Sequence, residues 1–157
     1  MSEKFQILLP VYNEASSIRK TLFDIYEALK DKINFEFIIT EDGSTDNTKE
    51  ILNDLKQQLP MILISDDKRK YYSIAVLDGI KKASSDFLLI MDSDGQCDPR
   101  QIFKFWNARK KADLVIGYRI KRRDFLYRKF FSDFAKLVYG LFFKVKLKDP
   151  SFAFSLI

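Results

Sequence analysis

The 157-residue sequence contains no histidine and a single cysteine, Cys97. One cysteine cannot form an internal disulfide, and without histidine a zinc site built from cysteine and histidine is excluded. No apolar run approaches the roughly 20 residues of a membrane-spanning helix. The N-terminal residues also lack the basic start, long apolar stretch and cleavage site of a secretory signal. We therefore expect a reduced, cytoplasmic protein that does not span the bilayer.

Glycine and proline are scarce as well, with 5 and 4 residues, whereas hydrophobic residues make up 46% of the chain. This composition predicts one globular domain over residues 1–157. Charge is distributed unevenly along it. Residues 1–99 hold 12 Lys or Arg and 18 Asp or Glu, a net charge of −6, whereas residues 100–157 hold 15 and 4, a net charge of +11. The acidic half suits metal ions, and the basic half suits phosphates, an anionic membrane or nucleic acid.

Apolar runs and helical patterns alternate along the chain, which indicates an α/β domain with a mostly parallel sheet. The continuous apolar runs predict strands, and the three- and four-residue spacing of apolar positions predicts helices. The expected strands are 5–9, 35–40, 61–64, 86–91 and 113–116, and the expected helices are 18–29, 46–59, 73–83 and 99–111.

Three polar segments follow strands of this expected sheet, at 10–14, 41–46 and 92–96. Ligands of open α/β sheets bind beyond the carboxyl ends of the strands. The three segments are therefore expected to converge on one edge, where the chemistry takes place.

Asp92 and Asp94 lie two residues apart in the third polar segment, and the amide of Gln96 follows. Oxygen ligands of this kind suit a hard divalent cation, Mg²⁺ or Mn²⁺. Such a cation would neutralise charge on a diphosphate leaving group. Asp-Ser-Asp-Gly is also an ordinary turn sequence, and taken alone it favours a turn.

The other two segments also have a structural interpretation. Ser44 or Thr45 is expected to cap the following helix, and Asn13 can be an N-cap with Glu14 as a first-turn acid. In a functional interpretation, Asp42 contacts a base or ribose at a strand end, beside the free amides of a helix N-terminus.

Taken together, Leu9-Pro-Val-Tyr-Asn-Glu14, Glu41-Asp-Gly-Ser-Thr-Asp-Asn-Thr48 and Met91-Asp-Ser-Asp-Gly-Gln96 resemble the family 2 inverting glycosyltransferases. They are most similar to the branch of dolichol-phosphate mannose synthases and bacterial polyprenyl-phosphate sugar transferases. The resemblance covers essentially the whole chain. It implies the GT-A fold, a three-layer α/β architecture with a mostly parallel central sheet.

The resemblance also implies roles for individual residues. Pro10, Tyr12, Glu14 and Asp42, together with Asp92, would bind the nucleotide. Asp92, Asp94 and Gln96 would hold the metal and the diphosphate. Arg119 and Arg128 would act in catalysis with Asp92 and Asp94, and Arg119, Arg128 and Ser132 would bind the acceptor phosphate. The planar guanidinium fork suits such a phosphate contact. Residues 1–99 would then form the donor and metal half, and residues 100–157 the acceptor and membrane-facing half.

The sequence departs from the family in several places. Glu41 stands where the family usually has aspartate, and residues 68–75 lack the Asn and Gly that are common there. Residues 149–155 lack the expected basic residue. The chain also ends soon afterwards, so we expect a catalytic domain that is incomplete at its C-terminus.

The basic half contains an apolar stripe at helical spacing over 130–142, with lysines around and after it. It predicts a helix packed on the domain's own sheet, an interfacial helix on an anionic membrane, or an oligomer contact. The membrane alternative would place the protein peripherally on the inner face of the membrane.

The leading hypothesis is transfer of a hexose from a UDP- or GDP-sugar to a polyprenyl or dolichyl phosphate with inversion. A phosphate acceptor is already ionised, so the lack of histidine as a general base mildly favours it. Transfer to a sugar hydroxyl in polysaccharide or glycan synthesis is the alternative. A non-catalytic nucleotide-sugar-binding protein is the alternative of another class. Nucleic acid is not an expected partner, because the acidic strand ends would repel its backbone.

Overall fold

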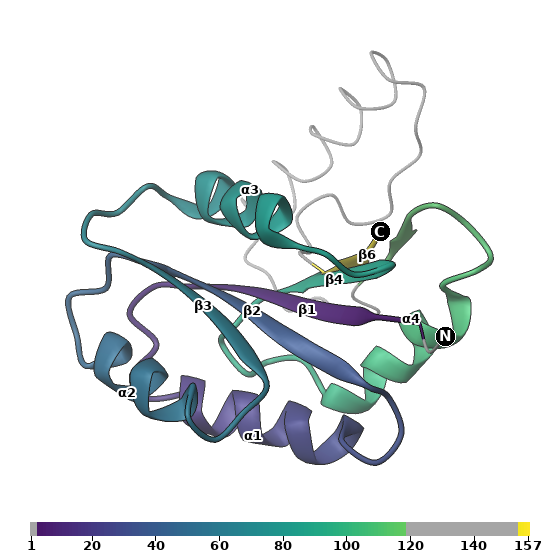
Figure 1. The fold of residues 1–157 in the computed structure, drawn as a ribbon, viewed down its shortest axis with the longest axis horizontal. Coiled ribbons are helices and arrows are strands. Elements are labelled where there is room, and N and C mark those ends of the chain that lie inside the picture. The colour runs from purple at the N-terminus through teal and green to yellow at the C-terminus, as the bar shows by residue number, and fades with distance from the viewer. Residues whose placement is uncertain (1–2, 119–153) are drawn as a thin grey trace, which may run out of the picture. The chain divides into compact units, whose positions relative to one another are not determined.

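The computed structural model of the chain describes residues 3–118 and 154–157 (Figure 1). The chain divides into two units, residues 1–115 with 155–157, and residues 116–154. Nearly all of the second unit lies outside the described residues. The described helices and strands belong almost entirely to the first unit.

Four parallel strands form the centre of the sheet: β1 (Phe5–Val11), β2 (Phe35–Asp42), β3 (Met61–Asp66) and β4 (Phe87–Met91). Their order is β3-β2-β1-β4, and the sheet continues through β6 (Phe154–Leu156) to β5 (Val115–Ile116). In the centre Leu8 pairs with Ile38 on one side and Ile90 on the other. This arrangement confirms the predicted mostly parallel sheet.

The helices cover both faces of this sheet. They are α1 (Ile18–Leu29), α2 (Thr48–Leu55), α3 (Tyr72–Lys82) and α4 (Ile102–Ala108), the last preceded by a 3₁₀ turn, η1 (Pro99–Gln101). In Figure 1, α1 and α2 lie below the sheet and α3 lies above it. The expected three-layer α/β fold is therefore confirmed. Among the described residues, no helix is long and apolar enough to cross a membrane.

The core forms where the apolar stripe of α1 meets the sheet. Every residue of β1 is buried, and Ile18, Leu22, Ile25 and Leu29 of α1 are at most 1% exposed. Their spacing of three to four residues places all four side chains on one face of the helix. Burying each such side chain stabilises the fold by about 1.5–3 kcal/mol.

The strands at the polar edge are longer than the sequence indicated. Pro10 and Val11 continue β1, and Glu41 and Asp42 continue β2, although all four were expected to follow their strands. Proline is tolerated here because the pairing of β1 with β4 ends at Leu8, so no partner on that side requires its missing N–H. The helix expected over 46–59 is shorter, and a turn precedes Pro60, which disfavours helix before it.

Candidate functional site

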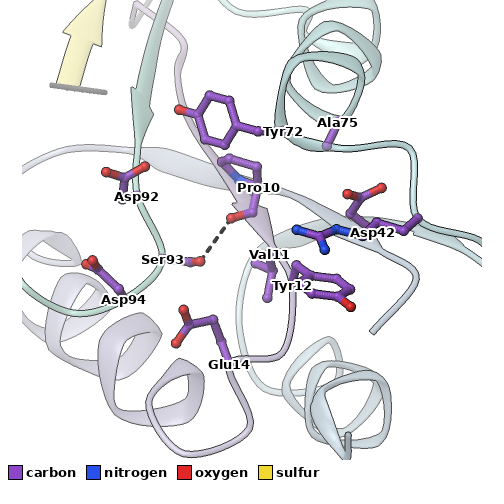
Figure 2. Close-up of a pocket in the computed structure, with 11 residues that line it drawn as sticks. Pro10, Val11, Tyr12, Glu14, Asp42, Tyr72, Ala75, Asp92, Ser93 and Asp94 are labelled. Carbon is purple, nitrogen blue, oxygen red and sulfur yellow. Dashed lines mark hydrogen bonds between the residues drawn. The ribbon is translucent and has the colours of Figure 1, made fainter. Parts of the chain in front are cut away.

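A cavity of about 280 Å³ opens at the carboxyl ends of β1, β2 and β4, beside the start of α3 (Figure 2). Eleven residues line it: Pro10, Val11, Tyr12, Glu14, Asp42, Arg69, Tyr72, Ala75, Asp92, Ser93 and Asp94. The structure thus brings the three predicted polar segments together, as the parallel topology requires.

The segment after β4 is tied to β1 through Ser93. This side chain is buried, and its hydroxyl donates to the backbone oxygen of Pro10 at 2.9 Å, the bond drawn in Figure 2. Asp92 and Asp94 flank it and both line the cavity. The segment therefore turns at a fixed distance from β1, with a carboxylate on each side of the anchoring serine.

The same segment forms a turn, as its sequence taken alone favoured. Gly95 has a φ of +72°, and the backbone N–H of Gln96 donates to Oδ1 of Asp94 at 3.0 Å. Glycine adopts this backbone without strain. The Gln96 side chain is exposed and is not among the described residues that line the cavity. Its role as a metal ligand stays a prediction.

The acidic side chains fit a divalent cation that shares its coordination with a bound phosphate. Asp92 and Asp94 supply the hard oxygen ligands that Mg²⁺ and Mn²⁺ prefer. Within residues 3–118 and 154–157, no group of three or more Asp, Glu, Cys or His forms a cage for a metal. Mg²⁺ is commonly held by one or two carboxylates together with substrate phosphates rather than by an all-protein cage. The donor set therefore fits a cation that arrives with a diphosphate.

Tyr72 adds a hydroxyl to the same cavity, which the sequence did not single out. Partial burial of a residue that is 47% exposed, and secondly the negative charge of Asp92, raise the pKa of Tyr72 to about 12. Its phenol thus keeps its proton near neutral pH and can donate a hydrogen bond. Figure 2 shows its ring on the Asp92 side of the cavity.

Asp42 and Glu41 end β2 with different roles. Asp42 lines the cavity, and its Oδ1 accepts the backbone N–H of Lys70 at 2.6 Å. Glu41 points away from the cavity, and its carboxylate is fully buried. The carboxylate accepts hydrogen bonds from the Ser44 N–H and, at 2.7 Å, from Ser65 Oγ. It also lies 3.7 Å from Lys49 Nζ. The acid at the family's first position therefore supports the loop and does not line the cavity.

The loops after β1 and β2 are interlocked by Asn13. Its N–H donates to Ser44 Oγ at 3.0 Å, and its Oδ1 accepts from the Thr45 N–H at 2.8 Å. The prediction that Asn13 is an N-cap is wrong, because the N-cap position of α1 is Ser17. Asn13 bridges two loops instead, with a φ of +55° that asparagine tolerates.

The start of α2 corrects a second capping prediction. Neither Ser44 nor Thr45 caps this helix; the carboxylate of Asp46 accepts the N–H of Thr48 at 3.0 Å and that of Ala15 at 3.2 Å. Burial acts to raise the pKa of Asp46, but these bonds and one from the Thr48 hydroxyl outweigh it and hold the pKa below its usual value. Asp46 therefore joins the loop after β1 to α2.

Arg69 is another polar lining residue that the sequence did not single out. Its guanidinium carbon lies 3.8 Å from the centre of the Tyr12 ring and 4.9 Å from that of Tyr71. The only signal was that residues 68–75 depart from the family, which did not show where these side chains lie. Of the predicted site residues, Arg119, Arg128 and Ser132 lie outside the described residues, as does the apolar stripe over 130–142.

Comparison with known proteins identifies one family. Residues 6–154 match the family described as glycosyl transferase family 2. A dolichol-phosphate mannosyltransferase from Pyrococcus furiosus is 35% identical over 117 residues, which cover 74% of this chain and 33% of that protein. An undecaprenyl-phosphate 4-deoxy-4-formamido-L-arabinose transferase from Yersinia pestis is 30% identical over 133 residues, which cover 81% of this chain and 40% of that protein. The chain thus matches about a third to two fifths of the length of these relatives.

Solved structures agree on the fold. A mannosyl-3-phosphoglycerate synthase from Rubrobacter xylanophilus is similar with a TM-score of 0.76 and 14% identity, over 98% of this chain and 52% of that one. A mannosyltransferase from Pyrobaculum calidifontis, solved with GDP-Man and Mn²⁺, is similar with a TM-score of 0.53 and 25% identity, over 60% of this chain and 28% of that one.

Proposed function

Because the chain belongs to glycosyl transferase family 2, we propose that it transfers a hexose from a UDP- or GDP-sugar to a polyprenyl phosphate, with inversion at the anomeric carbon. The observation that carries this proposal is the cavity at the carboxyl ends of β1, β2 and β4, where Asp42, Asp92 and Asp94 meet. The relatives named for dolichol-phosphate and undecaprenyl-phosphate support the choice of acceptor.

In this proposal the nucleoside lies on the β1 and β2 side of the cavity, against Pro10, Tyr12, Glu14 and Asp42. Figure 2 shows Tyr12 and Asp42 together on that side, with Asp92 and Asp94 across the cavity. The diphosphate then lies between the nucleoside and the end of β4. This placement follows from the length of a nucleotide sugar, whose phosphates separate the base from the sugar.

Asp92 and Asp94 would hold Mg²⁺ or Mn²⁺ against the diphosphate. When bound, the cation supplies positive charge that stabilises the departing nucleoside diphosphate. Tyr72 retains its proton near neutral pH and can donate a hydrogen bond beside Asp92. The acceptor phosphate is already ionised and needs no general base, so its oxygen attacks the anomeric carbon directly while the bond to the diphosphate breaks.

The acceptor half of the proposal concerns residues 100–157. Their net charge of +11 suits a lipid phosphate at an anionic membrane. Arg119, Arg128 and Ser132 are the proposed contacts to the acceptor phosphate, and Arg119 and Arg128 also the proposed catalytic cations. We place the protein peripherally on the cytoplasmic face of the membrane.

A transfer assay tests the proposal. The chain is incubated with radiolabelled GDP-mannose or UDP-glucose, Mn²⁺ and anionic vesicles that contain polyprenyl phosphate, and label in the lipid fraction is counted. We expect label in the lipid that is lost with Asp92→Asn, and cosedimentation of the chain with the vesicles. Label that appears only on added oligosaccharide would favour a hydroxyl acceptor. Nucleotide binding without transfer to either acceptor would favour a non-catalytic binding protein.

A further inference from the structure

Tyr71, at the start of α3, has a backbone conformation that tyrosine rarely adopts. Its φ is +69° and its ψ is 159°. This region is populated almost entirely by glycine, because a side chain there is strained. Tyr71 is also 66% exposed, so burial of its ring does not account for the residue. A strained, exposed aromatic residue beside a ligand cavity points to a role at that cavity.

The Tyr71 ring contacts Arg69. The Arg69 guanidinium carbon lies 4.9 Å from the centre of the Tyr71 ring and 3.8 Å from that of Tyr12. Both distances are within the range of cation–π attraction. Two rings therefore hold one guanidinium, and Tyr12 and Arg69 both line the cavity.

The backbone below Arg69 is fixed as well. The neighbouring Lys70 N–H donates to Oδ1 of Asp42 at 2.6 Å. Gly43, with a φ of +68°, lies so close that an added Cβ would be 2.6 Å from the backbone nitrogen of Arg69. Contacts within the protein thus hold the Arg69 side chain and the backbone beside it.

This arrangement decides how a nucleotide can be bound. Because Arg69 covers one face of the Tyr12 ring, that face is not open to a stacked base. Among the described residues that line the cavity, Arg69 is the one cationic side chain beside four carboxylates. Its planar guanidinium carries five N–H donors, which suit the oxygens of a base or a phosphate.

We propose that Tyr71 is a positioning residue that holds the Arg69 guanidinium over Tyr12, so that the cavity takes the nucleotide through the N–H donors of Arg69 rather than by stacking on that face of Tyr12. This inference rests on the proposed function, since it concerns the same nucleotide. Glycine at position 71 would fit the backbone without strain, but it would leave Arg69 with one ring in place of two.

Isothermal titration of the 157-residue chain with UDP and with GDP, each with Mn²⁺, tests the inference. Tyr71→Gly removes both the ring and the strain, so nucleotide affinity should fall by about two- to fivefold while the thermal midpoint stays level or rises. Tyr71→Phe keeps the ring and should retain the wild-type affinity. A loss of affinity without a loss of stability is not expected from a residue whose only role is structural.

A double-mutant cycle tests whether Tyr71 acts through Arg69. Arg69→Lys removes the planar fork, so Tyr71→Gly should weaken binding no further in that background. An equal loss in both backgrounds would mean that Tyr71 meets the nucleotide directly and would overturn the inference. Wild-type affinity in Tyr71→Gly, or a loss in Tyr71→Phe as large as in Tyr71→Gly, would also overturn it. A wild-type chain that binds neither nucleotide would contradict the proposed function itself.

Discussion

The described lining of the cavity holds four carboxylates, from Glu14, Asp42, Asp92 and Asp94, against the single guanidinium of Arg69. A nucleoside diphosphate adds further negative charge to this group. Like charges a few ångströms apart repel each other more strongly at a protein surface than in bulk water. Nucleotide binding should therefore depend on an added divalent cation.

Asp94→Asn tests this dependence because it removes one charge and keeps the shape of the side chain. We expect the gain in UDP or GDP affinity on adding Mn²⁺ to fall by about tenfold or more, equal to ~1.4 kcal/mol. Isothermal titration with and without Mn²⁺ measures it. Asp98→Asn is the matched control, since Asp98 pairs with Arg100 outside the cavity. A gain unchanged in Asp94→Asn would remove Asp94 from the site.

Tyr72 should make the fold sensitive to high pH. Its pKa is raised to about 12, whereas tyrosine in an unfolded chain ionises near 10.0. Between these two pH values the unfolded chain has lost the Tyr72 proton, whereas the folded chain keeps it. The contribution of the protonated phenol to the free energy of unfolding is therefore fully present below pH 10 and is lost as the pH rises towards 12. Unfolding followed against pH in the wild type and Tyr72→Phe should show a shallower decline in the variant. Equal declines would contradict the raised pKa.

At the scale of the elements, the site depends on loops that hold each other. Glu41 is the clearest case, since its carboxylate joins the loop after β2 to β3 through Ser44 and Ser65. Asn13 and Asp46 then join that loop to the one after β1. The cavity is therefore shaped by contacts between segments about 30 residues apart in sequence.

Glu41→Ala should destabilise the protein by about 1–3 kcal/mol, because it removes the fully buried carboxylate that accepts from the Ser44 N–H and the Ser65 hydroxyl. Chemical denaturation measures the loss. Glu50→Ala, an exposed acid in the first turn of α2, is the control and should cost less than about 0.5 kcal/mol. If Glu41→Ala were as mild as the control, Glu41 would not support the loop.

Gly79 allows α3 to lie close to β1. A Cβ added there would be 2.2 Å from Cδ1 of the buried Leu8. Gly79→Ala should therefore cost about 1–3 kcal/mol despite the higher helix propensity of alanine. Ser73→Ala, on the exposed part of the same helix, provides the comparison in thermal unfolding. Greater stability in Gly79→Ala would contradict this close packing.

For the molecule as a whole, the sequence predicted the layers and the edge that carries the site. Apolar runs and helical spacing are local signals, so every expected helix and strand in the described residues is present. The short strand β6 was not expected. It lies beside β4, and just after it the backbones of Ile157 and Leu88 exchange two hydrogen bonds of 2.8 and 3.0 Å. Three residues give too short a pattern to indicate a strand.

The candidate site was predictable only in part. Asp42, Asp92 and Asp94 follow or end strands, and parallel topology alone brings them together. Arg69 and Tyr72 come from the loop and helix after β3, where no pattern indicates that these two side chains line the cavity. Their position depends on the hydrogen bond from the Lys70 N–H to Asp42 and on the close approach of the chain to Gly43, and both contacts form only in the folded structure.

Titration of the unmodified chain with GDP-mannose and UDP-glucose, in the presence and absence of Mn²⁺, tests the central claim most directly. The structure predicts saturable binding of at least one of them that is much stronger with Mn²⁺, because the cavity's carboxylates repel the diphosphate without a cation. Absence of binding to both sugars with Mn²⁺ present would contradict the assignment of this cavity as the donor site.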